Sequence, residues 1–432
     1  MPITPRRIVF AIGLLAAANL QHAQARGDIE YMPYWYQPYD APAFEWFDSP
    51  EFDSADAEEA PINGYVARQA TTHNGRQVAK VLEPALTRLL QSGKLSAEQI
   101  KALEKFNAEL AQKPGAFGAA LEQLSGSQNA SLAAATQSTT QQLSSRVLST
   151  LRELPTDTDG HFWVKNLGSE GGLDRQRGTA GLDTANQGML LGADWAVDHA
   201  WRVGVLGAKS SSRLDAQRFS ADLDSWHLGG YAVRQDGPLA LRLGAIYSSH
   251  AGQNQRKVDI LGYKDALKGR YDANSQTVFG EAGYQLGDAD ISIEPFAGLG
   301  YQRYSRDSFR EQGGPAALNV DAQTQQNLSS TVGLRLAKPF RFDNQMTLTP
   351  HLSTSWKHLY GNVDSQVRQS FRQGGIEGFT IQGASLDRNS LNLQAGLDLA
   401  LSANHTLGLA YSAEKGTHSS NQGLIAQWRM GF

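Results

Sequence analysis

The chain ends in Asn421-Gln-Gly-Leu-Ile-Ala-Gln-Trp-Arg-Met-Gly-Phe432, where apolar and polar side chains alternate. Because successive side chains of a strand point to opposite faces, this stretch predicts a strand with one apolar and one polar face. Gln427 and Arg429 share the polar face. The apolar face carries Leu424, Ala426, Trp428, Met430 and Phe432. An outer-membrane barrel offers such a strand lipid outside and water or a plug inside.

The same period of two recurs from His161 onward. Every second residue from Leu391 to Leu401 is apolar, for example, whereas the positions between them are small or polar. Twelve segments are expected to be strands: 161–169, 187–197, 201–214, 224–235, 239–255, 273–287, 289–305, 327–339, 346–360, 389–402, 405–416 and 421–432. The inward sets are small or charged, so we expect an all-β transmembrane barrel of twelve antiparallel strands with a wet lumen.

The connections between these segments alternate in length. Tight turns are expected at 198–200, 236–238, 287–288, 341–345 and 403–404, and longer polar stretches at 170–186, 306–326 and 361–388. Short turns on one rim and long loops on the other are typical of outer-membrane barrels, whereas a soluble sandwich or propeller would bury its apolar faces against each other. Aromatic residues near the strand ends are expected to form two interfacial girdles: Trp195, Trp201, Trp226, Tyr247, Tyr284, Tyr301, Tyr304, Tyr360 and Trp428.

From about residue 77 to residue 154 the pattern becomes helical. A capping box, Ser96-Ala-Glu-Gln99, starts one helix, and a second short helix is expected around 117–124. A third run, 129–154, has no wide apolar face and suits polar surroundings with little room. Twelve strands about 4.8 Å apart and tilted by about 40° give a backbone radius of roughly 12 Å, enough for one helix. We therefore expect the last helix to thread the pore.

The N-terminal 25 residues have the pattern of a secretory signal. Arg6 and Arg7 form a basic start, an apolar run follows, and small residues precede a cleavage site between Ala25 and Arg26. Residues 26–75 are expected to be loosely folded. Their first part, 26–61, holds ten acidic residues and one arginine, and nine aromatic residues lie within 31–52. Such side chains prefer burial or a contact surface, so this segment either folds back on the protein or binds a partner.

Composition excludes several classes of function. The chain has no cysteine, so a disulfide framework and cysteine-ligated metal are excluded. The formal charge of −4 comes from the acidic leader, and the near-neutral body argues against nucleic acid as a partner. No motif for a metal or cofactor is present, and we expect neither.

Beyond these patterns, the chain resembles an autotransporter of type V secretion. The resemblance covers residues 75 to 432: the pre-barrel motif Leu121-Glu-Gln-Leu-Ser-Gly126, a pore segment, and a twelve-stranded translocator ending in Trp428-Arg-Met-Gly-Phe432. It implies export to the periplasm, recognition of the last strand by the barrel-assembly machinery, and display of an N-terminal passenger. Family members commonly release the passenger at an Asn-Asn pair. This chain has none, so we expect its short passenger to stay attached.

The charged lumenal residues are expected to form a network that braces the helix and not a catalytic site. They are Arg202, Arg242, Glu281, Glu294, Arg335, Lys357 and Asp398. The best catalytic candidate is Ser248 with His250, but the sequence specifies no acid partner for this pair, and hydrolase and phosphate-loop motifs are absent. We therefore expect no enzymatic activity.

These expectations divide the chain into a signal peptide (1–25), a short passenger (26–75), a helical pre-barrel region (76–128), a pore helix and linker (129–155) and a barrel (156–432). The expected protein is a monomeric translocator in the Gram-negative outer membrane. It contacts lipid, periplasmic chaperones and the assembly machinery, and it exposes its N-terminal segment on the cell. The alternatives are a surface adhesin or structural protein acting through residues 26–125, or a channel or barrel-embedded lipase.

Overall fold

The computed structural model describes residues 64–432, apart from 94, 99, 102–104, 106–107, 110–111, 114, 155–158, 177, 261–262, 288–290, 344–345 and 374. The expected signal peptide and most of the expected passenger therefore lie outside the described residues. No described helix has the length and apolarity needed to cross a membrane.

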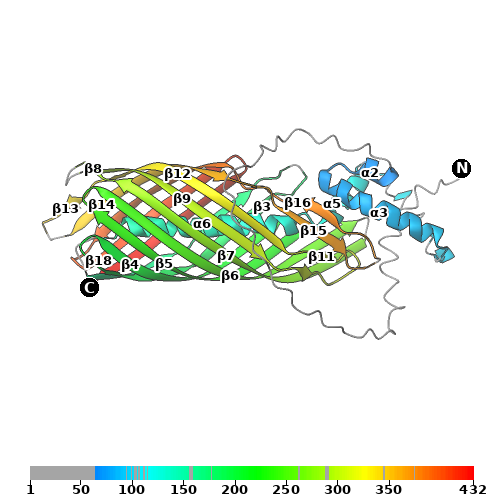
Figure 1. Cartoon of the computed structure of the whole chain (residues 1–432). Helices are drawn as coiled ribbons and strands as arrows, with labels where there is room; N and C mark the ends of the chain where they lie inside the picture. Colours follow the sequence, from blue (N-terminus) through cyan, green and yellow to red (C-terminus); the bar gives the residue numbers. More distant parts are fainter. Residues whose placement is uncertain are drawn as a thin grey trace, which may run out of the picture.

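Strands from Gly160 onward form a closed antiparallel ring (Figure 1). β1 (Gly160–Asn166) and β2 (Ser169–Leu173) both pair with β3 and with β19, so they count as one interrupted strand. The other strands are β3 (Leu182–Ala196), β4 (Trp201–Ala216), β5 (Phe219–Asp236), β6 (Leu239–Ile260), β7 (Tyr263–Tyr284), β9 (Ser292–Arg306), β12 (Gln323–Ala337), β14 (Thr347–Tyr360), β17 (Asn389–Ala400), β18 (His405–Gly416) and β19 (Ser419–Gly431). Two-residue strands, β8 (Leu286–Gly287) and β13 (Phe340–Arg341), extend two hairpins at the turns. The predicted barrel of twelve strands is confirmed.

The first and last strands close the ring. His161 lies opposite Gly431 and Lys165 opposite Gln427, and Gly160 and Phe432 exchange two backbone hydrogen bonds of 3.0 Å. Closure leaves no strand edge unpaired. This matters in a membrane, because lipid cannot hydrogen-bond to free backbone N–H and C=O groups. Leu424, Trp428 and Phe432 lie exposed on the outer face of β19.

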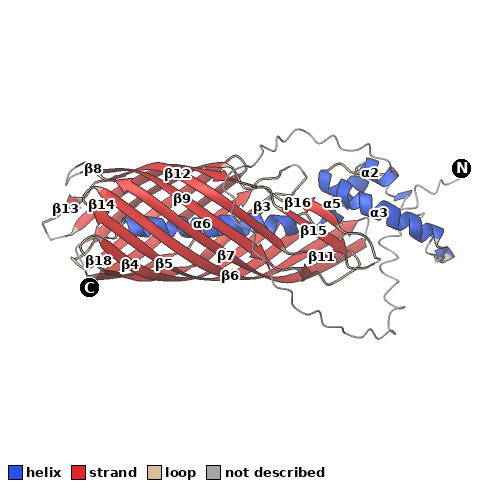
Figure 2. Ribbon diagram, in the orientation of Figure 1, coloured by secondary structure: helices blue, strands red, loops and turns tan. Residues whose placement is uncertain are grey.

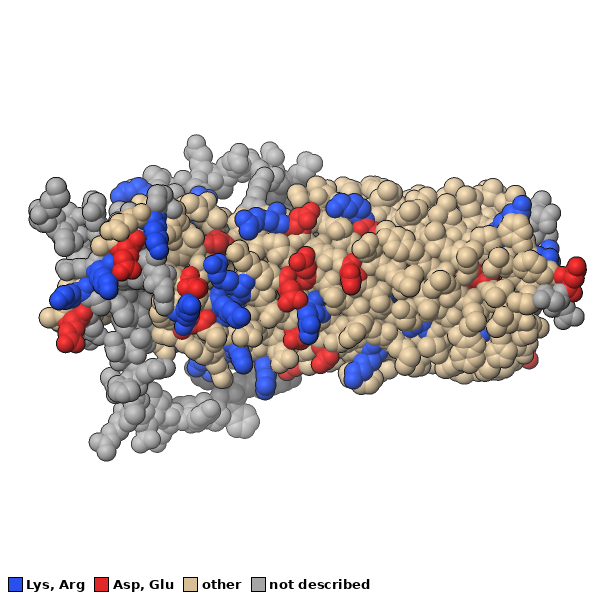
Figure 3. All heavy atoms as spheres, turned by 180° about the vertical axis from the view of Figure 1, so that it is seen from behind, with Lys and Arg blue, Asp and Glu red and all other residues tan. Residues whose placement is uncertain are grey.

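The outer surface has an apolar belt. Figure 3 shows exposed charges over the half of the barrel nearer the N-terminal helices and at the opposite end, with a nearly uncharged band between. Among the exposed aromatic side chains, Trp195, Tyr284 and Trp428 lie near the short turns, and Trp226, Tyr247, Tyr301 and Tyr360 lie farther along their strands. Such girdles mark the two membrane interfaces. Tyr304 was assigned wrongly, because its side chain is fully buried on the inner face of β9.

Several strands extend beyond their expected ends. β5, β6 and β7 include residues 219–223, 256–260 and 263–272, whose polar outward residues hide the alternation. The stretches expected as long loops hold a second sheet of four strands: β10 (Phe309–Arg310), β11 (Leu318–Val320), β15 (Gln366–Phe371) and β16 (Phe379–Gln382). Its buried residues include Val320, Val367 and Ile381. These strands were missed because runs of two to six residues barely show a period.

Four helices precede the barrel in the described residues: α2 (Tyr65–Gln69), α3 (His73–Gln91), α5 (Ala116–Ser125) and α6 (Gln128–Arg152). Thr72 Oγ1 caps α3 by accepting from Gly75 N at 3.0 Å, so helical structure starts earlier than expected and replaces the loose segment from residue 65. Gly126, at φ 59°, ends α5 in the left-handed conformation that glycine adopts without strain. The helix expected after Ser96 falls largely outside the described residues.

The first three helices pack at the end of the barrel where the second sheet lies, as Figure 1 shows. Val78, Leu86 and Leu121 of α3 and α5 share one apolar core with residues of the barrel and of the second sheet. Asn74 pairs with the edge of β16 in both directions, donating to Gln382 O and accepting from Gln382 N at 2.8 Å each. The helices thus form a cap over the barrel's long-loop end.

Replacing Asn74 with Ala should loosen this cap. The Gln382 backbone would lose both partners at a part-buried position, a loss of about 1–3 kcal/mol. Hydrogen exchange should accelerate in α3 and β16 and stay unchanged in the barrel strands. Thr87→Ala is the matched control, because the Thr87 hydroxyl donates to Glu83 O within α3. Equal exchange in Asn74→Ala and wild type would contradict this role.

Candidate functional site: the helix inside the barrel

α6 runs through the barrel lumen, enclosed by strands (Figure 2). Its N-terminal half contains small residues, Ala133 to Ala135, which are almost completely buried. Thr136 and Thr140 bond back to backbone carbonyls one turn earlier, at 2.8 and 2.9 Å, so their hydroxyls are satisfied without leaving the helix. A slender helix of this kind fits a narrow lumen, and the prediction that the last helix threads the pore is confirmed.

The N-terminal end of α6 is held by a buried polar cluster near the cap. Asn129 donates to Glu311 Oε1 at 3.1 Å and accepts from Asn254 at 2.8 Å, and its carbonyl accepts from Arg306 at 2.9 Å. Arg256 pairs with Glu311 at 2.6 Å. Arg256 and Glu311 were not predicted as lumenal residues, because both lie beyond the segments expected to be strands.

Four of the predicted lumenal residues meet at the other end of α6. Arg242 contacts Glu281 at 3.1 Å and Glu294 at 2.7 Å, and Arg335 contacts Glu294 at 2.6 Å and Glu281 at 3.8 Å. Arg152, from the last turn of α6, donates to Glu281 and lies 4.6 Å from the Phe296 ring centroid. Three guanidinium groups and two carboxylates thus connect the helix to β6, β7, β9 and β12.

The other three predicted residues lie apart from this group. Arg202 pairs with Asp194 at 2.9 Å within the barrel wall. Lys357 pairs with Glu414 at 2.5 Å and donates to Gln141 of α6 at 3.2 Å. Asp398 accepts a hydrogen bond from Gln427 at 2.9 Å. The seven residues therefore form several separate contacts and not one network.

One side of the lumen is apolar, which corrects the expectation of a wholly wet interior. Leu143, Val147 and Leu151 form a stripe on α6 that packs against the barrel wall. Their partners are Trp163, Leu190, Leu206, Tyr231, Val233, Ile246 and Phe279. Trp163 donates to Tyr231 Oη at 2.8 Å, so its buried indole nitrogen is satisfied. The pattern concealed this cluster because these residues occupy the strand face that is elsewhere small or polar.

The opposite side of α6 is polar. A cavity of about 160 Å³ lies between the helix and β7, β9, β12, β14 and β17–β19. Its lining includes Gln141, Arg152, Glu281, Gln302 and Lys357. The helix therefore packs tightly against one wall and leaves a chamber suited to water along the other.

The structure does not pair Ser248 with His250. Ser248 Oγ lies 2.7 Å from His227 Nδ1, whereas His250 lies between Ser225 and Ser275 at 2.7 and 2.9 Å. These buried contacts link neighbouring strands. Ser248 and His250 therefore serve in hydrogen bonds between adjacent strands.

The family model for the autotransporter β-domain matches residues 162–412. An extracellular serine protease of Serratia marcescens is 31% identical over 276 residues, which are 63% of this chain and 26% of the protease. Esterase EstA of Pseudomonas aeruginosa is 23% identical over 272 residues, 60% of this chain and 41% of the esterase. The matches thus cover less than half of either relative.

Among solved structures, the translocator domain of autotransporter NalP from Neisseria meningitidis has the same fold. Its TM-score is 0.55 at 14% identity, covering 70% of this chain and 99% of that domain. A closed twelve-stranded barrel with an apolar belt and a helix in its lumen defines an outer-membrane protein of the translocator class. The chain belongs to the autotransporter family and lies in the outer membrane of a Gram-negative bacterium. The matched domain is a translocator and not a catalytic domain.

Replacing Glu281 with Gln should destabilise the helix and the barrel together. The Glu281 side chain is 2% exposed, and its neutralisation removes the carboxylate that contacts Arg152 and Arg242, a loss of about 3 kcal/mol. Urea unfolding in detergent, followed by tryptophan fluorescence, should show an earlier midpoint. Asp236→Asn removes the partner of Arg234 in an exposed pair and should change stability by less than about 1 kcal/mol. Equal midpoints for the two variants would contradict the bracing role.

Removing residues 129–154 should open the pore. The lumen would lose the helix and keep its polar wall, so ions should cross with a large and steady conductance. Planar-bilayer recordings of the full chain and the deletion provide the comparison. Unchanged conductance in a deletion that still folds as a barrel would mean that α6 does not plug the lumen.

Proposed function

We propose that this chain carries its own N-terminal segment across the outer membrane and displays it on the cell surface. The observation that supports the proposal is the path of α6. Its N-terminal end lies beneath the cap at the long-loop end, and its C-terminal end lies with the short turns. Short turns are periplasmic in outer-membrane barrels, so a chain emerging before α6 would face the outside.

The proposal divides the chain as the sequence suggests. Residues 1–25 act as a signal peptide cleaved between Ala25 and Arg26, 26–75 form the displayed segment, 76–128 the pre-barrel region, 129–155 the pore helix and linker, and 156–432 the barrel. The α2 and α3 helices support a boundary nearer residue 64 for the start of the pre-barrel region.

Delivery would follow the route of other members of the family. Periplasmic chaperones carry the unfolded barrel, and the assembly machinery recognises the apolar face of β19, from Leu424 to Phe432. The exposed Leu424, Trp428 and Phe432 support this role, because apolar side chains on one strand face offer a surface to a partner before they meet lipid. The proposed product is a monomer, since the ring is closed without a partner strand.

We propose display without catalysis. The protease and esterase relatives carry those activities in their names, but the matches cover 26% and 41% of their lengths. The stretch before the barrel is acidic and aromatic, which favours binding to a partner over chemistry. An adhesive function of residues 26–125 is therefore the second candidate, and surface exposure is required for both.

Protease treatment of intact cells tests the proposal. An epitope placed before residue 64 should disappear, because the display path puts it outside. The same epitope in the turn at 236–238 is the matched control and should stay intact until the outer membrane is opened. Protection of the N-terminal epitope on intact cells would overturn the display function, whereas loss of both epitopes would indicate leaky membranes and require a gentler treatment.

A further inference from the structure

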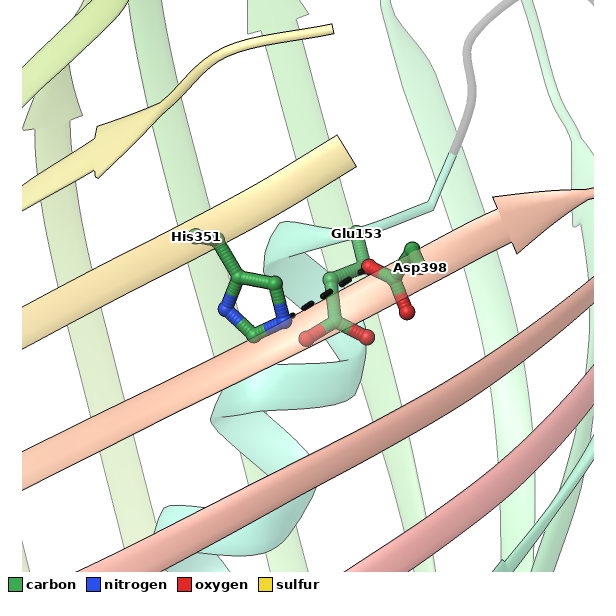
Figure 4. Close-up of side chains that lie close together, drawn as sticks. All are labelled: Glu153, His351 and Asp398. Atoms are coloured by element: carbon green, nitrogen blue, oxygen red, sulfur yellow. Dashed lines mark ion pairs between the residues drawn. The ribbon is translucent and has the colours of Figure 1, made fainter. Parts of the chain in front are cut away.

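Three metal-ligating side chains converge where α6 ends, near the short turns. Figure 4 shows Glu153 from the end of α6, His351 from β14 and Asp398 from β17 turned toward one another. One ligand atom from each lies within 4.8 Å of the others. The three come from separate elements, so their approach is a property of the fold and not of one local sequence.

His351 is the group that points to a ligand. Its side chain is 9% exposed, and Nε2 lies 3.8 Å from Asp398 Oδ2, too far for a hydrogen bond. Among the described residues the ring has this ion pair with Asp398 and makes no hydrogen bond. A nine-tenths buried imidazole without a hydrogen-bond partner directs one nitrogen into the gap between the carboxylates.

Gln427 holds the two carboxylates in place. Its Nε2 donates to Glu153 Oε2 at 2.6 Å and to Asp398 Oδ1 at 2.9 Å. Each carboxylate has a second oxygen, and Asp398 Oδ2 is the one nearer His351. Outer hydrogen bonds of this kind orient the ligands of protein metal sites.

Two glycines make the room for this arrangement. Gly396 lies opposite His351 in the strand pairing, and a Cβ there would come within 2.5 Å of His351 Nε2. Gly408 lies opposite Asp398, and a Cβ there would come within 2.3 Å of Asp398 Oδ1. Any other residue at these positions would displace the His351 imidazole or the Asp398 carboxylate.

Two positively charged side chains lie near the three ligands. Lys165 and Arg429 act electrostatically on Glu153. The same two charges oppose an incoming cation, so strong nitrogen and oxygen donors are needed to bind one. Imidazole with two carboxylates suits a divalent transition metal.

We propose that Glu153, His351 and Asp398 bind one divalent transition-metal ion, such as Zn²⁺, which ties the end of the pore helix to β14 and β17. Bonds of about 2.0–2.2 Å put two ligands of a tetrahedral ion roughly 3.4 Å apart. Small side-chain rotations close the remaining distance. The ion makes Glu153 a cross-link between the helix and two strands, so withdrawal of α6 requires its release.

Zn²⁺ titration of the full chain in detergent, after removal of metal with a chelator, tests this site. Calorimetry should give one ion per chain, and Zn²⁺ should raise the thermal unfolding midpoint. Glu153→Gln, His351→Ala and Asp398→Asn should each lose at least about 100-fold in affinity, and Gln427→Ala about 10–100-fold. His358→Ala, on the same strand but turned away from the site, should bind as wild type does.

Heat-dependent gel migration shows whether each variant has folded as a barrel. Glu153→Gln leaves the barrel wall unaltered, so its result stands even if the strand variants fail to fold. No binding to the wild type would overturn the proposal. Binding that survives in Glu153→Gln with wild-type affinity would overturn it too, because the ion would then bind elsewhere, such as at surface histidines.

Discussion

The enclosed volume of a twelve-stranded barrel is the constraint on which the rest of this structure depends. A ring of this size is too wide for wall side chains alone to fill and too narrow for more than one helix. α6 solves the problem with alanines and hydroxyl residues where space is tight, and with Leu143, Val147 and Leu151 where the wall offers an apolar surface. The helix is thus part of the barrel's core, and its sequence is explained by the shape of the space.

Polar groups along α6 follow from the same constraint. A helix packed on one side only leaves backbone and side-chain groups facing a wet chamber, where charged partners are tolerated more readily than in a dry core. Asn129 is fixed by buried partners at one end, Gln141 by Lys357 in the middle, and Arg152 by Glu281 at the other end. The contacts are spaced along the axis, so rotation or sliding of the helix would break more than one of them.

The sequence predicted the barrel well because membrane barrels encode themselves in a strict alternation. The strands from Asn389 to Gly431 match their expected segments within a few residues, since lipid demands an apolar side chain at every second position. The alternation is weaker in the parts of the strands that extend beyond the apolar belt. Residues 256–260 and 263–272 continue β6 and β7 with polar outward side chains, and the short strands of the second sheet have too few residues to show a period. Contacts inside the lumen were more difficult to predict than the strands. Arg242 and Glu294 could be placed on the inner face from the sequence. Their contact with each other, and the apolar cluster at Trp163, depend on which strands face one another across the barrel.

The contacts of α6 distinguish a segment still moving through the pore from one that has reached its final position. A segment in transit would make exchangeable contacts, because each register along the pore has to be similar in energy. Here withdrawal would leave Glu311 without its hydrogen bond from Asn129, and Glu281 without its contact with Arg152. It would also expose the apolar wall around Trp163 and Tyr231 to water. These losses are specific to one register, so the described structure is that of a helix at rest. A chain anchored in this way keeps whatever precedes it attached to the membrane, unless a cut is made on the outer side of Asn129.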